Sequence, residues 1–148
     1  MKEENQLSVE VAEADKTRRM LNSWTLELAN WLMSEVDMTR KEAFRKAHLT
    51  RRLLDGLGRG VVEFQYVKEN GEVREARGTL CPGVSEDFDR YEYKREDAEA
   101  FTRADEHGVY VYFDLERKAF RAFAAKRLVG MKGMKKGGKL MSAFGRRC

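Results

Sequence analysis

The residues best suited to chemistry in this sequence are the lysines and arginines of its C-terminal end. After Glu116 there is no acidic residue, while residues 117–148 carry 11 lysines and arginines. Residues 1–116 hold the other 18 basic residues and all 25 acidic residues, so the formal net charge of +4 conceals a body of net charge −7. A cationic segment beside an acidic body attracts polyanions. The pattern therefore favours phosphate contacts that are independent of sequence and sensitive to salt.

Arginines of the region before this segment could extend the path of a bound nucleic acid. We expect Arg74, Arg77 and Arg121 to do so, with Tyr110 or Tyr112 as a stacking face if either is exposed. The residues expected to contact nucleic acid are Arg74, Arg77, Arg121, Lys126, Arg127, Lys132, Lys135, Lys136, Lys139, Arg146 and Arg147. The alternative is that the cationic end is only a solubilising or disordered tail.

Motifs for catalysis or metal binding are missing from the sequence. There is no G-x-S-x-G motif, and Cys81 has no histidine signature near it. The glycines of residues 56–60 follow a predicted helix rather than a strand, so they form a linker and not a phosphate-binding loop. His48 and His107 lack metal-ligand spacing, and the acidic residues around Asp87 are typical of a solvated loop. We expect a protein that is no enzyme and needs no cofactor or metal.

The first third of the sequence predicts helices. Residues 1–15 are acidic and polar, which indicates a disordered N-terminus. Apolar residues then recur at three- and four-residue spacing, which predicts a helical hairpin over residues 16–57. Trp24 and Trp31 lie seven residues apart on one helix face. They are either core residues of the hairpin or a stripe that binds a partner protein.

The following region predicts short strands. Residues 61–67 and 72–80 flank Asn70-Gly71, a strong hairpin signal. Residues 109–114 and 119–123 form a second hairpin, and a short last element contains Leu128. The stretch 82–107 reads as a long polar loop with at most a short strand or helical turn. Phe64, Tyr66, Leu80, Val111, Phe113, Phe123 and Leu128 are the expected barrel core.

This β-rich region resembles a family of small bacterial and phage proteins described as WYL-like, with an Sm-like barrel of the SH3 type. The resemblance rests on VEFQY, the KENG turn, REARGTL, VYFDLE and FRAF, which together cover about half of the chain. It implies an antiparallel β-barrel and a setting in phages and mobile elements, but no catalytic residues. The expected fold is α+β, with a disordered segment (1–15), a helical hairpin (16–57), an Sm-like barrel (58–129) and a flexible basic tail (130–148).

Three functions remain open from the sequence. The first is a non-catalytic accessory protein of a phage or mobile element that binds DNA or RNA. The second is a module that docks onto a host protein as an inhibitor or adaptor, and the third is a virion or assembly component that associates with itself. Two cysteines are too few for a disulfide framework, and no apolar run is long enough for a membrane span, so we expect the cytoplasm of a bacterial host or a virion.

Overall fold

The computed structural model describes residues 2–135. The chain divides between Ala47 and His48 into two compact units, which are described separately. The division falls inside a helix, whereas the sequence predicts the barrel to begin at residue 58. Residues 50–57 of that helix belong with the barrel because Leu53 and Leu57 are fully buried in the barrel core.

The N-terminal unit is built from α1 (Lys2–Glu35) and the first part of α2 (Arg40–Leu57). Residues 2–15 are therefore helical where the sequence predicts disorder, because residues 2–35 contain no glycine or proline to interrupt good helix formers. Asp37 adopts a left-handed backbone conformation (φ 59°) between the two helices. The hydroxyl of Thr39 then accepts a hydrogen bond from the Glu42 amide at 3.3 Å, which caps the start of α2.

Packing faces within this unit follow the helical period. Among the α1 residues whose burial is described, Thr25, Leu28, Ala29 and Leu32 are buried. In the first part of α2, the buried residues are Ala43 and Ala47, which are spaced four apart. Trp24 and Trp31 are half-buried on α1. No helix among residues 2–135 is long and apolar enough to cross a membrane.

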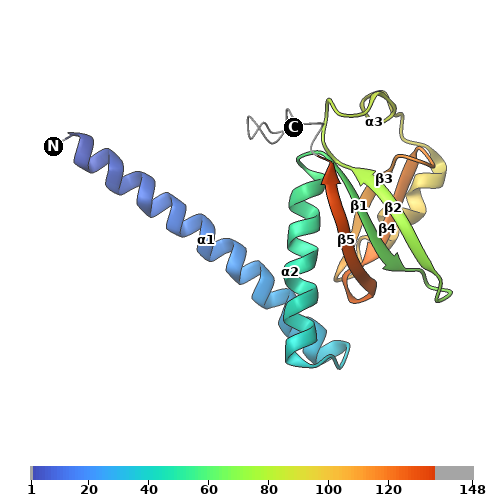
Figure 1. The fold of residues 1–148 in the computed structure, drawn as a ribbon, viewed down its shortest axis with the longest axis horizontal. Coiled ribbons are helices and arrows are strands. Elements are labelled where there is room, and N and C mark those ends of the chain that lie inside the picture. The colour runs from blue at the N-terminus through green and yellow to red at the C-terminus, as the bar shows by residue number, and fades with distance from the viewer. Residues whose placement is uncertain (1, 136–148) are drawn as a thin grey trace. The chain divides into compact units, whose positions relative to one another are not determined.

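The described residues of the second unit, 48–135, contain five antiparallel strands in the order β4-β3-β2-β1-β5. They are β1 (Val61–Val67), β2 (Val73–Thr79), β3 (Val109–Asp114), β4 (Ala119–Ala124) and β5 (Leu128–Lys135). The Asn70-Gly71 turn forms as predicted, with Gly71 at φ 92° and the Lys68 amide bonded to the Glu72 carbonyl at 2.8 Å. Figure 1 shows the five strands wrapping into one curved sheet.

Strand β5 is longer than the sequence predicts. It pairs with β1 from Leu128 to Lys135, with register shifts that mark irregular pairing. Residues 130–135 are thus part of the sheet rather than of a flexible tail. Glycines at 130 and 133 carry no apolar side chain, so the alternation that signals a strand is missing here. The predicted tail from residue 136 onward lies outside the described residues.

The barrel core is aromatic. Phe64, Tyr66, Phe123 and Leu128 are buried as predicted, and they pack with Tyr112, which is fully buried instead of offering a stacking face. Phe113 is also fully buried, while Leu80 and Val111 are only partly buried. Fully burying one aromatic side chain contributes about 1.5–3 kcal/mol, so these rings dominate the stability of the unit.

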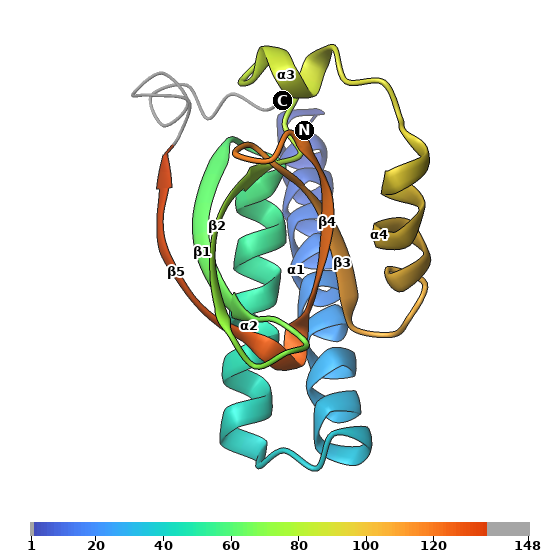
Figure 2. The same cartoon turned by 90° about the vertical axis from the view of Figure 1, so that its right-hand side faces the viewer.

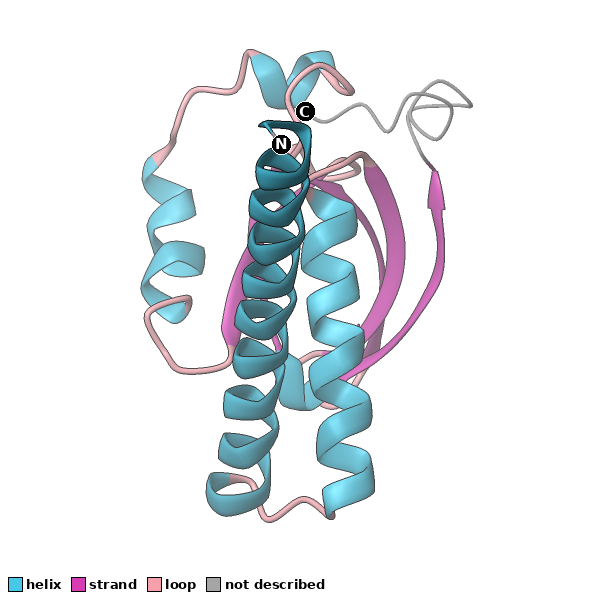
Figure 3. Ribbon diagram, turned by 90° about the vertical axis from the view of Figure 1, so that its left-hand side faces the viewer, coloured by secondary structure: helices cyan, strands magenta, loops and turns pink. Residues whose placement is uncertain are grey.

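The stretch between β2 and β3 is ordered in short helices rather than an extended loop. It contains α3 (Glu86–Asp89), the 3₁₀ turn η1 (Arg95–Asp97) and α4 (Ala98–Arg103). Figure 3 shows these short helices joined by loops, and Figure 2 shows α4 lying beside β3 and β4. A second 3₁₀ turn, η2 (Ala125–Arg127), leads from β4 into β5.

Candidate anion-binding site

The site arises where two neighbouring strands separate. Strand β2 pairs with β3 only through Gly78 and Thr79, at the end of β2. Gly78 allows this close approach, because a Cβ there would lie 2.5 Å from Cδ2 of Tyr112 and 3.0 Å from the Phe113 carbonyl oxygen. From Val73 to Ala76, β2 has no partner residue on β3. Arg74 lies in this part of β2, which pairs with β1 but not with β3.

Arg74 is held by aromatic groups. Its Nη1 donates a 3.4 Å hydrogen bond to the Tyr66 hydroxyl, and its guanidinium lies over the Tyr66 ring at 6.0 Å from the centroid. The Tyr66 hydroxyl in turn bonds the buried Tyr112 hydroxyl at 2.8 Å. Among the described residues no carboxylate lies within ion-pair distance of Arg74, so its charge is available to a ligand.

The electrostatics of this group favour the charged form of Arg74 and the neutral form of Tyr112. Burial opposes the charge of Arg74, but its interactions with Tyr66 and Tyr112 outweigh burial and raise its pKa. Burial also raises the pKa of Tyr112, and the neighbouring Tyr66 hydroxyl adds to the effect. Arg74 therefore stays charged while the ring and hydroxyl of Tyr66 hold its guanidinium in place.

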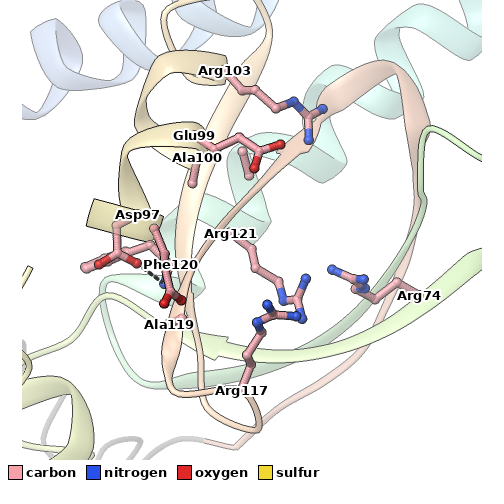
Figure 4. Close-up of a pocket in the computed structure, with 11 residues that line it drawn as sticks. Arg74, Asp97, Glu99, Ala100, Arg103, Arg117, Ala119, Phe120 and Arg121 are labelled. Atoms are coloured by element: carbon pink, nitrogen blue, oxygen red, sulfur yellow. Dashed lines mark hydrogen bonds between the residues drawn. The ribbon is translucent and has the colours of Figure 1, made fainter. Parts of the chain in front are cut away.

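Two adjoining clefts share Arg74 and Arg103. The first, here called the α4 cleft, has a volume of about 180 Å³ and its charged lining is Arg74, Arg103, Arg117, Arg121, Glu96, Asp97 and Glu99. The second, here called the turn cleft, has a volume of about 290 Å³ and its charged lining is Lys68, Glu69, Arg74, Arg103 and Arg127. We call both together the arginine groove. Figure 4 shows Arg74, Arg117 and Arg121 pointing toward a common space.

Three of the six cations that line the groove differ from Arg74 in having a carboxylate beside them. Arg121 Nε donates to Asp114 Oδ2 at 2.7 Å, and this pair is largely buried. Arg103 pairs with Glu69 at 3.2 Å, and Lys68 pairs with Glu72 at 3.1 Å. Arg117 and Arg127, like Arg74, have no carboxylate partner among the described residues. The turn cleft therefore has the larger excess of positive charge.

Asp97 positions the wall formed by α4. Its carboxylate accepts hydrogen bonds from the Tyr91 hydroxyl at 2.7 Å, the Lys94 amide at 2.8 Å and the Phe120 amide at 3.2 Å. Burial alone would raise the pKa of Asp97, but these three donors outweigh it and hold the pKa below its ordinary value. Burial and the Asp97 carboxylate raise the pKa of Tyr91 to about 12. Asp97 is thus a structural anchor and not a ligand-binding acid.

The structure brings together only some of the residues expected to contact nucleic acid. Arg74, Arg121 and Arg127 line the groove. Arg77 is exposed but lines neither cleft, because alternate residues of β2 point to opposite faces. Lys126 is exposed on η2, and Lys132 of β5 pairs with Glu75 at 3.2 Å.

The other expected contacts are placed only by the backbone or not at all. The backbone of Lys135 pairs with Val61 at the end of β5. Lys136, Lys139, Arg146 and Arg147 lie outside the described residues. So does Cys148, while Cys81 is buried after β2. No group of three or more potential metal ligands occurs within residues 2–135.

Sequence reasoning missed Lys68, Arg103 and Arg117 as lining residues. Arg103 ends α4, which the polar stretch did not reveal as a packed element, and its proximity to residue 69 depends on the tertiary fold. Arg117 was counted in the cationic end but not placed at a site. Only the turn position of Lys68, beside Asn70-Gly71, was readable from the sequence.

Comparison with known proteins identifies the barrel. The family model for WYL_2, Sm-like SH3 beta-barrel fold, matches residues 50–129. The chain belongs to the WYL_2 family. The match begins inside α2, in agreement with the leucines of that helix that complete the barrel core. No curated protein and no solved structure matches the chain. The WYL_2 assignment confirms the predicted Sm-like fold, and the groove lies within its limits.

Proposed function

We propose that this protein is a non-catalytic accessory protein of a phage or mobile element that binds nucleic acid without sequence preference. The arginine groove and the basic C-terminal segment supply the contacts. The observation that carries the proposal is Arg74, a half-buried cation with no carboxylate partner among the described residues. Phosphate oxygens would complete its hydrogen bonding, because a guanidinium presents paired donors to a phosphate.

The distribution of charge favours a polyanion over a small anion. Arg74, Arg103 and Arg127 line the turn cleft, and Arg117, in the turn between β3 and β4, lines the α4 cleft. Several cations along an open cleft match the repeating charges of a nucleic-acid backbone. Of the 11 basic residues after Glu116, Arg117, Arg121 and Arg127 line the groove, and the other eight add positive charge in the C-terminal part of the sequence.

The test is fluorescence anisotropy of labelled single- and double-stranded oligonucleotides over a salt series. Arg74→Ala should weaken binding about tenfold, and the slope of log K against log salt should fall by about 0.7–0.9. Arg77→Ala is the matched control, because Arg77 lies on the same strand but lines neither cleft. Loss of affinity in both variants alike, or no binding at low salt, would contradict the proposal.

A second candidate is a protein-interaction module. Tyr93 and Phe101 are 61% and 40% exposed, and their rings lie 5.7 Å apart on the segment between β2 and β3. Exposed aromatic pairs are typical of protein interfaces. Capture of a partner that survives nuclease treatment and is lost in Tyr93→Ala would favour this function.

A further inference from the structure

Glu69 is the acidic residue of the turn cleft. It stands in the β1–β2 turn, and its Oε1 lies 3.2 Å from Nη2 of Arg103 at the end of α4. The carboxylate side chain is 70% exposed and that of Arg103 is 31% exposed. Because Arg103 also lines the α4 cleft, this ion pair stands where the two clefts adjoin. A ligand strand that follows the groove must pass it.

We propose that Glu69 is a specificity-determining residue of the groove: its carboxylate occupies Arg103 in the free protein and is displaced by a phosphate of the bound strand. This inference rests on the proposed nucleic-acid function. A carboxylate and a phosphate present similar oxygen pairs to a guanidinium, so one can replace the other. An exposed ion pair of this kind is weak, so displacement is not prohibitive.

The consequence is selection by charge density. A lone carboxylate ligand would exchange one carboxylate for another at Arg103 and gain nothing there. A phosphodiester chain also reaches Arg74 and Arg127, which have no carboxylate to lose among the described residues. Glu69 therefore disfavours ligands with a single acidic group. Phosphodiester strands remain as the ligands that can separate the Glu69–Arg103 ion pair.

Salt dependence separates this role from a general charge effect. With ionised Glu69 beside it, Arg103 neutralises no net phosphate charge when a strand binds. With a neutral side chain at position 69, Arg103 neutralises one phosphate more. The slope of log K against log salt should then steepen by up to about 0.7–0.9.

The experiment compares the full-length protein with Glu69→Gln and Glu75→Gln by anisotropy on the same oligonucleotides. Glu75 is the matched control because it is exposed, pairs with Lys132 and lines neither cleft. We expect Glu69→Gln to bind about 3- to 10-fold tighter with a steeper salt slope, and Glu75→Gln to change affinity less than about twofold. The double variant Glu69→Gln/Arg103→Ala should bind no better than Arg103→Ala alone.

Two adverse outcomes are distinct. Equal affinity and slope for Glu69→Gln and Glu75→Gln, with binding intact, would overturn the role of Glu69 and leave the nucleic-acid function standing. Absence of binding by all proteins at low salt would overturn the nucleic-acid function and the role of Glu69 together. Thermal unfolding of each variant checks that the substitutions leave the fold unchanged.

Discussion

Arg74 and Arg121 show how two arginines in one groove are held by different means. Arg121 is fixed by the buried carboxylate of Asp114, which also accepts the Glu116 and Arg117 amides. Arg74 is fixed by the Tyr66 hydroxyl and ring instead. Aromatic support orients a guanidinium without neutralising it, so Arg74 keeps a full charge for a ligand.

Gly78 should tolerate no side chain. A Cβ added at position 78 would meet the buried Tyr112 ring and the Phe113 carbonyl oxygen, both of which are held in the sheet. Gly78→Ala should therefore lower the free energy of unfolding by about 1–3 kcal/mol, as overpacking does. Urea denaturation measures this effect, and Gly71→Ala is no substitute control because its positive φ adds strain. Unchanged stability in Gly78→Ala would mean that β2 and β3 do not approach as described.

Asp97 should make stability dependent on acid pH. Its folded pKa is below its ordinary value, so its contribution is complete above about pH 4 and is lost as pH falls through the folded pKa. Asp97→Asn places an amide among donors and should cost about 1–3 kcal/mol at neutral pH. Urea denaturation from pH 7 to pH 3 should show the two proteins converging in acid. A constant difference across that range would contradict the assigned role.

Elements with a strong local signal were predictable from the sequence, and elements defined by pairing were not. The Asn70-Gly71 hairpin depends on neighbouring residues, so the sequence predicted it correctly. The extension of β5 depends on backbone bonds with β1, which glycines permit without any apolar pattern. The helix in residues 2–15 was missed because composition alone suggested disorder. The groove was not predictable because its residues come from separate elements that only the tertiary fold brings together.

The end of β5 determines where the chain can be shortened. A protein ending at Val129 loses residues 130–135, which form most of the strand that pairs with β1, whereas a protein ending at Lys135 keeps the whole strand. We expect the melting temperature of the shorter protein to be lower by about 5 °C or more, because β1 loses most of its pairing with β5. The longer one should melt within about 2 °C of the full chain. Circular dichroism melting curves decide this, and equal curves for both truncations would contradict a structural role for residues 130–135.

At the scale of the whole molecule, the arginine groove and the basic residues 136–148 should contribute separately to the binding of a polyanion. Residues 136–148 carry Lys136, Lys139, Arg146 and Arg147 and no acidic residue. A chain ending at Lys135 keeps the arginine groove but loses these four charges. The slope of log K against log salt should therefore fall in magnitude by up to about 3, at about 0.7–0.9 per phosphate contact. If the chain ending at Lys135 still binds and Arg74→Ala weakens this binding, the remaining affinity belongs to the groove. Complete loss of binding would assign recognition to the cationic end alone, and an unchanged slope would show that the end makes no phosphate contacts.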